Sequence, residues 1–248
     1  MVPLLVLHGF TGCGEAMAPL TDHLDGPVLA PNLPGHGSDW KEDANEPWGI
    51  EETARDLLSR TESKPLIDVL GYSMGGRVAL AMAAEAPDRV RSLTLVSASA
   101  GIADPALRDE RRVEDFALAA RIREKGIQWF VDHWSSQPMW ASQEKLTGSV
   151  RMAQRWLKLS NSAEGLARSL EQAGQGAMRP LFDELPKLDL PVDLIVGELD
   201  PKYQHIAREL ADLLPEPSLR VMKGAGHAVH LESAEELARV VNLCREIL

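Results

Sequence analysis

Short apolar runs bounded by turn residues recur along the chain and predict buried strands. Runs that are apolar throughout are typical of strands covered on both faces of a parallel sheet. Stretches with helical periodicity lie between them, as expected of strand–helix–strand units, so the alternation predicts an α/β fold with helices on both faces of a mostly parallel sheet. The predicted strands are Pro3–Leu7, Val28–Ala30, Ile67–Leu70, Ser92–Val96, Val192–Val196 and Leu219–Met222, and the predicted helices are Glu51–Arg60, Met74–Glu85, His205–Leu214 and Ala234–Ile247.

This alternation is interrupted between about Asp104 and Asp183, where amphipathic helical patterns occur without a convincing strand. Four of the six tryptophans lie in this stretch. We expect residues 1–103 and 184–248 to form an α/β core, and residues 104–183 to form a helical lid over the catalytic edge of the sheet. The alternative is a helical layer on the surface without a role at the site.

The composition is that of an ordinary globular protein, with 44% hydrophobic and 25% charged residues in 248. The net charge of −11 repels phosphate backbones, so nucleic acid is not an expected partner. The two cysteines, Cys13 and Cys244, lack CxxC spacing and predict neither a disulfide framework nor a cysteine metal site. No apolar run reaches the roughly 18 residues of a membrane-spanning helix, and no basic leader is present. We therefore expect a cytoplasmic protein without membrane insertion.

One predicted strand-to-helix junction carries a nucleophile motif. The apolar run Ile67–Leu70 leads into Gly71-Tyr72-Ser73-Met74-Gly75, a Gly-x-Ser-x-Gly pattern, and a helix rich in alanine and leucine follows. In this motif the serine sits on a strained turn, and the small residues two before and two after it let neighbouring backbone pass closely. The turn exposes the serine Oγ at the carboxyl edge of the sheet, beside a helix N-terminus that can stabilise an anion. The sequence therefore predicts Ser73 as the reactive residue.

A reactive serine needs a base, and the base needs a group that orients it. Asp200 follows the run Val192–Val196 and His227 follows Leu219–Met222, so both lie at carboxyl ends of predicted strands. The order Ser, Asp, His along the chain is that of the α/β-hydrolases. We expect His227 to carry the proton of Ser73, and Asp200 to fix the tautomer of His227 and balance its charge. A loop histidine in solvent is the alternative for His227 taken alone.

An anion that develops at this site needs hydrogen-bond donors. The backbone N–H of Met74, directly after the serine, supplies one, and a loop after an early strand supplies a second. His8-Gly9-Phe10-Thr11-Gly12 follows the first predicted strand, so we expect Phe10 to provide this second N–H; a plain glycine turn is the alternative. The remaining histidines show no metal-ligand spacing with acidic residues, and the sequence contains no glycine-rich phosphate loop. No metal or other cofactor is expected.

These motifs give the chain a resemblance to the α/β-hydrolase superfamily over nearly its full length. More narrowly, the chain resembles the 2-succinyl-6-hydroxy-2,4-cyclohexadiene-1-carboxylate synthases of menaquinone biosynthesis. The narrower resemblance rests on the order and spacing of modest motifs: Gly71–Arg77, Arg108 with Arg111 and Asp115, Trp134–Pro138 followed by Trp140, and Ser160–Leu170. Many members of that family carry an arginine directly before the Ser-Asn pair, where this chain has Leu159 with Lys158 beside it.

The resemblance implies a lyase without net hydrolysis. Its substrate would be 2-succinyl-5-enolpyruvyl-6-hydroxy-3-cyclohexene-1-carboxylate, which would lose a proton and expel pyruvate. The Ser73–His227–Asp200 triad would then act as a base and form no acyl-enzyme. The two backbone N–H groups would hold the negative charge that develops on the succinyl ketone.

A substrate with three carboxylates needs local cations in an acidic protein. Arg77 lies one helical turn after Ser73, and Arg108 and Arg111 share one face of a predicted helix. A planar guanidinium binds a carboxylate through two hydrogen bonds, so we expect the three arginines to bind substrate; a solvated surface charge is the alternative for any one of them. The resemblance adds three aromatic side chains as walls of the site, for which ordinary packing is the alternative: Tyr72, Trp134 and Trp140.

Two other functions are compatible with the sequence. A carboxylesterase or carbon–carbon bond hydrolase would use the same fold and triad, because neither fixes the substrate. A non-catalytic receptor for a small acid would need only the fold, and the complete triad argues against it. For the leading function, the expected partner is a small carboxylate-bearing molecule.

Overall fold

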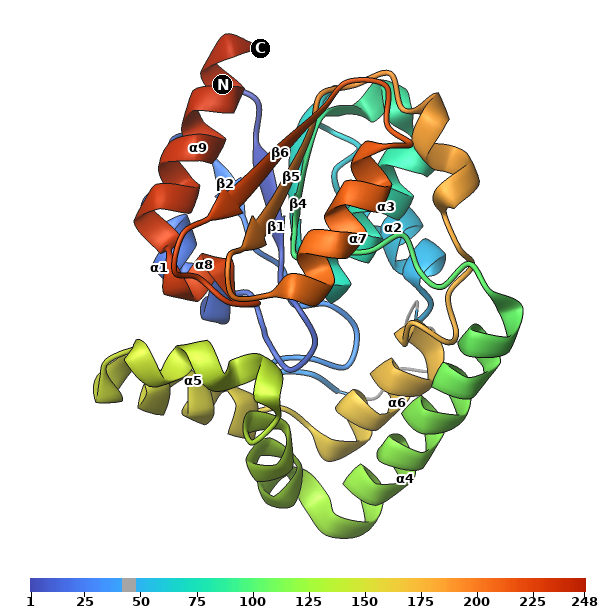
Figure 1. Ribbon diagram of the computed structural model, residues 1–248, viewed down its shortest axis with the longest axis vertical. Coiled ribbons are helices and arrows are strands. Elements are labelled where there is room, and N and C mark those ends of the chain that lie inside the picture. The colour runs from blue at the N-terminus through green and yellow to red at the C-terminus, as the bar shows by residue number, and fades with distance from the viewer. Residues whose placement is uncertain (42–47) are drawn as a thin grey trace.

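A computed structural model describes residues 1–41 and 48–248, so that residues 42–47 of the expected core lie outside the described ranges. Six strands form one sheet in the order β2-β1-β3-β4-β5-β6, and every neighbouring pair is parallel (Figure 1). This confirms the predicted α/β fold. The strands are β1 (Leu4–Leu7), β2 (Val28–Leu29), β3 (Ile67–Tyr72), β4 (Val90–Val96), β5 (Val192–Gly197) and β6 (Pro217–Met222).

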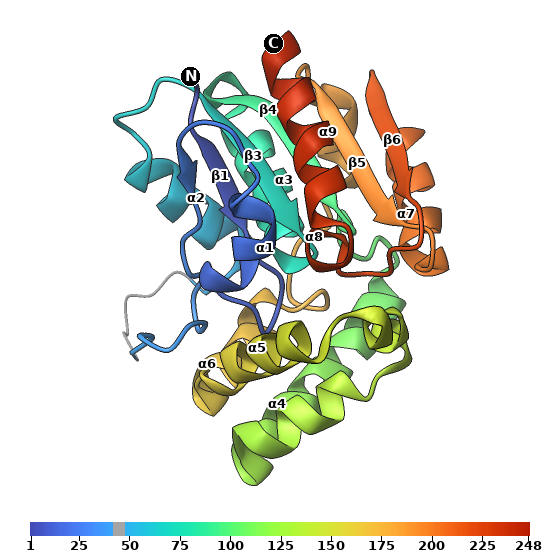
Figure 2. The same cartoon turned by 90° about the vertical axis from the view of Figure 1, so that its left-hand side faces the viewer.

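Helices cover both faces of the sheet and bury two separate apolar cores (Figures 1 and 2). Successive residues of β1 point to opposite faces, so Leu5 joins the core under α2, α3 and α7, and Val6 joins the core under α1, α8 and α9. This two-sided burial explains why the strands are apolar throughout. The helices are α1 (Ala18–Thr21), α2 (Ile50–Arg60), α3 (Met74–Glu85), α7 (Pro201–Ala211), α8 (Val229–Glu232) and α9 (Ala234–Ile247).

The predicted strands and most of the predicted helices agree with the structure to within two residues at each end, and α7 is the exception. The prediction of a helix over His205–Leu214 is wrong in its bounds, because α7 begins at Pro201 and ends at Ala211. Asp200 caps this helix by accepting a hydrogen bond from the N–H of Tyr203 at 3.2 Å. The Asp-Pro pair is the start signal that the apolar pattern alone did not reveal.

Between β4 and β5 the described chain leaves the sheet and forms only helices. We call residues 104–183 the helical insertion; it contains α4 (Pro105–Ser135), the 3₁₀ helix η3 (Pro138–Lys145), α5 (Gly148–Leu159) and α6 (Ala163–Ala173). Gly126, with φ 77° and ψ 173°, breaks the helical geometry inside α4. Figures 1 and 2 show α4, α5 and α6 lying beyond the end of the sheet to which the strand arrows point. The insertion therefore faces the carboxyl ends of the strands.

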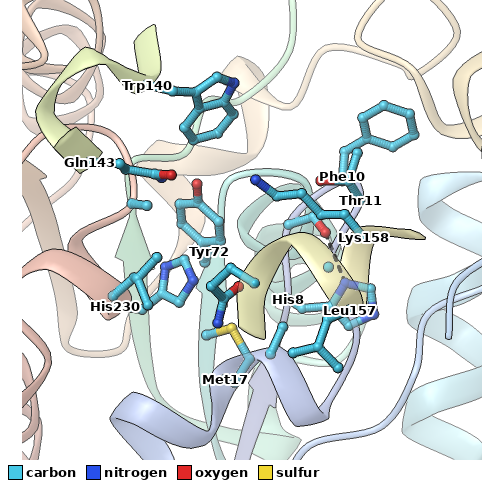
Figure 3. A pocket seen from close by; sticks show the side chains of 16 residues that line it. His8, Phe10, Thr11, Met17, Tyr72, Trp140, Gln143, Leu157, Lys158 and His230 are labelled. Atoms are coloured by element: carbon cyan, nitrogen blue, oxygen red, sulfur yellow. Dashed lines mark hydrogen bonds between the residues drawn. The ribbon is translucent and has the colours of Figure 1, made fainter. Parts of the chain in front are cut away.

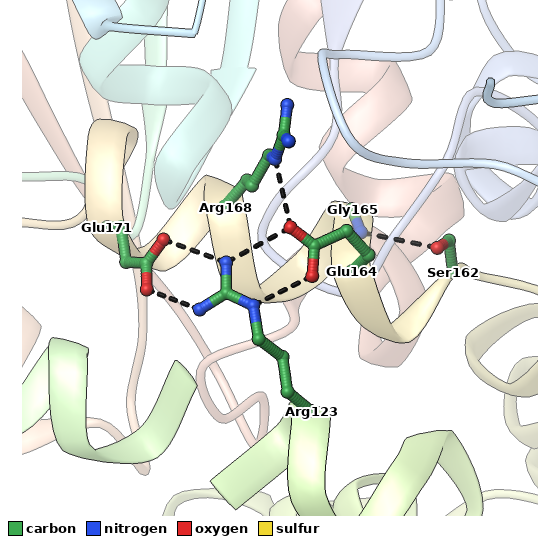
Figure 4. Close-up of polar contacts among 6 residues, drawn as sticks. All are labelled: Arg123, Ser162, Glu164, Gly165, Arg168 and Glu171. Atoms are coloured by element: carbon green, nitrogen blue, oxygen red, sulfur yellow. Dashed lines mark hydrogen bonds and ion pairs between the residues drawn. The ribbon is translucent and has the colours of Figure 1, made fainter. Parts of the chain in front are cut away.

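Helices α4 and α6 are joined by a buried apolar cluster and by an ion-pair network on its exposed side. Phe130 of α4 and Leu166 of α6 are both fully buried in the cluster. Arg123 of α4 binds Glu171 and, at 2.7 Å, Glu164 of α6 (Figure 4). A network shared by several side chains holds its geometry better than isolated surface pairs, so it keeps the two helices in register.

The insertion is fastened to the core through backbone contacts. A Cβ on Gly165 would lie 2.4 Å from the carbonyl oxygen of Gly35, and a Cβ on Gly35 would lie 2.4 Å from the carbonyl oxygen of Gly165. The two backbone segments can therefore touch only because both residues lack side chains. The buried Asn161 donates to the carbonyl of Thr11 at 3.0 Å and accepts from the N–H of Gly37 at 2.9 Å. These contacts set the height of the insertion above the sheet.

Three further findings concern residues 1–41 and 48–248 alone. No helix in these ranges is both long enough and apolar enough to cross a membrane. No three His, Cys, Asp or Glu side chains in them are grouped in a way that could hold a metal ion. Cys13 and Cys244 are both free thiols, and Cys13 is buried against Ala16 and Leu157.

Candidate active site

Ser73 stands at the junction of β3 and α3 in a strained backbone conformation. Its φ of 52° and ψ of −108° lie outside the regions that non-glycine residues favour. The turn is held by the N–H of Ser73, which donates to the carbonyl of Val96 at 2.9 Å. A Cβ on Gly75 would lie 2.3 Å from the carbonyl oxygen of Leu7, so α3 starts in direct contact with the end of β1. This is the close backbone approach that the Gly-x-Ser-x-Gly pattern predicts.

The structure brings Ser73, His227 and Asp200 into one hydrogen-bonded chain. His227 Nδ1 lies 2.7 Å from Asp200 Oδ2, and His227 Nε2 lies 3.2 Å from Ser73 Oγ. With the ring proton on Nδ1 donated to the carboxylate, Nε2 is left to accept the hydroxyl proton of Ser73. His227 is 2% exposed and Asp200 is 9% exposed, so water does not compete strongly for either. The arrangement can remove a proton from a molecule placed beside Ser73.

Two residues that the sequence analysis did not identify support His227. Glu232 Oε2 accepts from the N–H of Gly226 at 2.8 Å, and its Oε1 accepts from the N–H of Ala228 at 3.3 Å, so one carboxylate holds the amides on both sides of the histidine. The ring of Tyr203 lies over the imidazole with the two centroids 4.5 Å apart. A glutamate five positions after the histidine and an aromatic residue three positions after Asp200 were visible in the sequence, but their contacts depend on how the loops curl.

The loop after β1 lies against Ser73, and His8 orients it. A Cβ on Gly9 would lie 3.4 Å from the Cβ of Ser73. Burial lowers the pKa of His8 to about 3, so its ring is neutral. His8 Nε2 accepts from the N–H of Leu33 at 2.9 Å, which leaves the proton on Nδ1 to be donated to the carbonyl of Gly9, also at 2.9 Å.

This hydrogen bond fixes the peptide that joins Gly9 to Phe10. In a trans peptide the N–H points opposite to the carbonyl, so holding the Gly9 oxygen also aims the N–H of Phe10. Within residues 1–41 and 48–248 the N–H groups of Phe10 and Met74 have no hydrogen-bond acceptor. Two unpaired donors beside a reactive serine are what an oxyanion hole requires.

A cavity of about 500 Å³, which we call the main cavity, opens at Ser73 between the sheet and the helical insertion. Its size is within the usual range of small-molecule sites. Phe10, Met74 and the triad line its floor, and Tyr72, Trp134 and Trp140 stand among its walls, as the sequence analysis expected. The rings of Trp140 and His227 pack edge to face, with their centroids 5.6 Å apart.

Among the described residues, Arg77 and Arg111 are the two arginines that line the main cavity. Arg77 is 7% exposed, and burial lowers its pKa to about 10, so the guanidinium is still charged at neutral pH. It donates to the backbone carbonyl of Ala173 at 2.6 Å, but no carboxylate in the described ranges forms an ion pair with it. Arg111 pairs with Asp115 at 2.8 Å and reaches Gln175 at 3.4 Å. The main cavity therefore holds a buried positive charge that an anionic ligand could neutralise.

Arg108 is placed differently from the other two arginines. It is not among the described residues that line the main cavity. Its guanidinium donates to the carbonyls of Ile102 and Ala103 at 2.9 and 3.2 Å, at the start of α4. The spacing of Arg108 and Arg111 puts them on one helix face, but only the second is far enough along α4 to reach the cavity.

The chain has relatives among known proteins. A model of the alpha/beta hydrolase family matches residues 4–240. The chain is 30% identical to the 2-succinyl-6-hydroxy-2,4-cyclohexadiene-1-carboxylate synthase of Salmonella newport (strain SL254), over 97% of this chain and 94% of the relative. The solved structure of MenH from S. aureus matches with a TM-score of 0.90 at 31% identity, covering 97% of this chain and 91% of that one. A malate-bound thermophilic esterase from Thermogutta terrifontis matches with a TM-score of 0.84 at 25% identity, over 99% of this chain and 90% of the esterase.

Proposed function

This chain belongs to the alpha/beta hydrolase family and, within it, to the 2-succinyl-6-hydroxy-2,4-cyclohexadiene-1-carboxylate synthases, and on that basis we propose that it is a pyruvate-eliminating lyase of menaquinone biosynthesis. Its substrate is 2-succinyl-5-enolpyruvyl-6-hydroxy-3-cyclohexene-1-carboxylate, and its products are 2-succinyl-6-hydroxy-2,4-cyclohexadiene-1-carboxylate and pyruvate. The proposal includes a cytoplasmic site of action and no cofactor.

One observation beyond kinship carries the proposal. The main cavity combines a complete proton-transfer triad with the buried charge of Arg77, which no described carboxylate pairs. A hydrolase of neutral esters has no need of an unpaired guanidinium beside its serine. A substrate with three carboxylates supplies the missing negative charge, and Arg77 and Arg111 bind it.

In the proposed mechanism His227 takes the hydroxyl proton of Ser73, and Ser73 Oγ removes the proton next to the succinyl ketone. The electron pair of the broken C–H bond moves through the ring, and the bond from the ring to the enolpyruvyl oxygen breaks, so that pyruvate leaves as its enolate. The proton held by His227 balances the one that the enolate carbon takes up to give pyruvate. The N–H groups of Phe10 and Met74 hold the negative charge on the ketone oxygen while it develops. Asp200 keeps the His227 tautomer correct and stabilises the imidazolium.

The helical insertion acts as a lid in this proposal. Trp134 and Trp140 come from the insertion and line the main cavity, so α4 and η3 complete the wall that keeps water from the reacting atoms. Arg111 comes from the same segment, and substrate therefore binds the core and the insertion at once. Residues 104–183 are the lid, and residues 1–103 and 184–248 are the core. The prediction that Arg108 binds substrate is separate from this proposal, because Arg108 is not among the described residues that line the main cavity.

Pyruvate release from freshly prepared substrate tests the proposal. Purified wild type and Ser73→Ala are compared with the uncatalysed rate, because the substrate also eliminates slowly without enzyme. We expect fast release by wild type and a loss of at least a thousandfold in kcat for Ser73→Ala, the usual effect of removing a triad member. Release at the background rate from folded wild-type protein would remove the proposal.

A carboxylesterase is the second candidate, favoured by the likeness to the Thermogutta terrifontis esterase and by the complete triad. Its sign is turnover of simple aryl esters that disappears in Ser73→Ala. The same two proteins are assayed with a neutral aryl ester beside the first experiment. Ester turnover without pyruvate release selects the esterase.

A further inference from the structure

A second, smaller cavity lies behind Tyr72, and we call it the Lys158 cavity. It has a volume of about 40 Å³, room for roughly three water molecules or one carboxylate group. The loop His8–Gly12 and Tyr72 line it from the core, and Trp140, Gln143 and Lys158 line it from the insertion. Figure 3 shows the polar ends of Tyr72, Gln143 and Lys158 directed into this space beside Trp140.

Lys158 brings an unpaired positive charge into the cavity. It lies near the end of α5, whose Leu157 packs on Cys13 and Ala16 of the core and so holds the lysine over the loop. No carboxylate of residues 1–41 or 48–248 forms an ion pair with its ammonium. Its only described partner is the ring of Trp140, with Nζ 5.5 Å from the centroid, and such a contact offsets only part of the cost of burying a charge. Burial, and then the charge of Arg155, lower the pKa of Lys158.

The other polar groups around the cavity also have free hydrogen-bonding capacity. His230 is 5% exposed and its Nδ1 has no partner. Burial lowers the pKa of His230 to about 3, so the ring is neutral and can donate a hydrogen bond without adding charge. The pKa of Tyr72 is raised well above its usual value by burial, so its hydroxyl stays protonated and can donate as well. A cation, a hydroxyl and an imidazole around this volume suit one carboxylate.

The Lys158 cavity adjoins the main cavity and a third cavity on its other side. Phe10, Tyr72 and Trp140 line both the Lys158 cavity and the main cavity. Trp140, Gln143 and Lys158 also line a third cavity of about 260 Å³, whose outer rim includes Arg151 and Arg155. Trp140 is thus shared by all three spaces. The Lys158 cavity therefore lies between the space at Ser73 and the third cavity.

We propose that the Lys158 cavity is a carboxylate-binding subsite, with Lys158 as its cation and Tyr72 and His230 as hydrogen-bond donors. The carboxylate has two possible sources under the proposed function, on which this inference rests. It belongs either to the bound substrate or to the small acid that the reaction releases. Both sources use the same chemistry, and kinetics separates them.

The test compares Lys158→Met, Lys158→Arg and wild type. Lys158→Met keeps the aliphatic stem against Trp140 and removes the charge, and Lys158→Arg restores a cation. We expect Lys158→Met to raise either the KM of the substrate or the inhibition constant of pyruvate about tenfold or more, with kcat changed less than twofold, and Lys158→Arg to recover most of the loss. A raised KM identifies a substrate carboxylate, and a raised inhibition constant at unchanged KM identifies the released acid.

Lys145→Met is the matched control, because Lys145 is an exposed lysine of the same insertion and its loss changes the net charge equally. Calorimetric titration of pyruvate and of succinate into each protein needs no turnover, so it tests the subsite even if pyruvate elimination fails. Equal KM, inhibition constants and binding in Lys158→Met and wild type would overturn the subsite. An equal loss in Lys145→Met would also overturn it, because the effect would then be one of overall charge. Urea unfolding of each variant checks that the fold is intact.

Discussion

Buried charges lie near both ends of strand β3, and they differ in whether the protein supplies them with partners of opposite charge. Near its start, Asp68 is 1% exposed and every oxygen is satisfied: Arg91 donates to both, Ser92 to Oδ1 at 2.8 Å and Arg245 to Oδ2 at 2.9 Å. Just beyond its end, around Ser73, the charges of Arg77 and Lys158 have no carboxylate partner in the described chain. The same strand therefore separates a closed polar cluster from an open one.

The difference teaches which buried charges serve the fold. The Asp68 cluster ties β3 to β4 through Arg91 and Ser92, and to α9 through Arg245. Arg245 also donates to the carbonyls of Asp25 and Val2, both at 2.7 Å. It needs nothing from outside the chain. The open cluster becomes satisfied only when an anion arrives, so its cost to stability is recovered as binding free energy.

The largest effect on stability is expected at the closed end. Asp68→Asn removes the negative charge and leaves Arg91 and Arg245 without a counter-charge. Breaking a buried pair from one side costs about 3–5 kcal/mol, so we expect the free energy of unfolding in urea to fall by about 3 kcal/mol. The kcat of the folded fraction should be unchanged, because Asp68 lies at the far end of the strand.

The free energy of unfolding measured at low pH tests whether the loss in Asp68→Asn is electrostatic. Burial raises the pKa of Asp68, but the hydrogen bonds from Arg91, Arg245 and Ser92 outweigh it and hold the pKa below the ordinary 3.8. Its stabilisation is therefore complete above pH 3.8 and is lost as the pH falls through the folded-state pKa. Wild type and Asp68→Asn should converge in stability as the pH falls below that value. A constant gap would contradict the electrostatic explanation.

At the open end we expect a small effect on stability and a large effect on substrate binding. Arg77→Met removes a charge that has no described counter-ion and sacrifices two hydrogen bonds, one to the carbonyl of Ala173 and a weaker one to the Sδ of Met178. We expect the free energy of unfolding to fall by no more than about 1 kcal/mol, while the KM for the tricarboxylate rises ten- to a hundredfold with the loss of a charge-assisted contact. A large loss of stability with an unchanged KM would place Arg77 with the closed cluster.

A smaller effect is expected at Glu232, which is neither part of the closed cluster nor a ligand of the substrate. Glu232→Gln keeps one acceptor oxygen and frees one of the two amides beside His227, so the imidazole should be less well positioned. We expect kcat to fall about five- to twentyfold at nearly constant KM, because a small misplacement of a base slows proton transfer more than binding. Glu236→Gln is the control, since Glu236 is exposed and bonds only Ser233 among the described residues. Equal kcat in both variants would leave Glu232 without a positioning role.

The sequence predicted the sheet and the elements that bear the triad because these follow from local pattern. Strands buried on both faces are apolar throughout, and parallel strands bring their carboxyl ends to one edge. The approach of Ser73, Asp200 and His227 follows from these two rules. The need for glycine around Ser73 could also be predicted from the motif, and in the structure backbone atoms fill the space beside Gly71 and Gly75.

What the sequence could not show are contacts that join three or more distant segments. The Lys158 cavity needs the loop after β1, the end of β3, η3, α5 and α8 to meet, and no periodic pattern encodes that meeting. Helical spacing placed Arg108 beside Arg111, but how far each reaches depends on where α4 docks. The start of α7 was missed because Asp200 both caps a helix and bonds His227.

The contact between Gly35 and Gly165 has a consequence for mutational tolerance. Neither residue lines the main cavity, yet a methyl group on either would push the insertion away from the core through rigid backbone. Two positions 130 apart in sequence thus share the requirement for a residue without a side chain. A second substitution cannot relieve the clash, because each glycine already has no side chain to shorten. In a library selected for activity both positions should remain glycine, as invariant as the triad itself, although their contribution is one of spacing and not of chemistry.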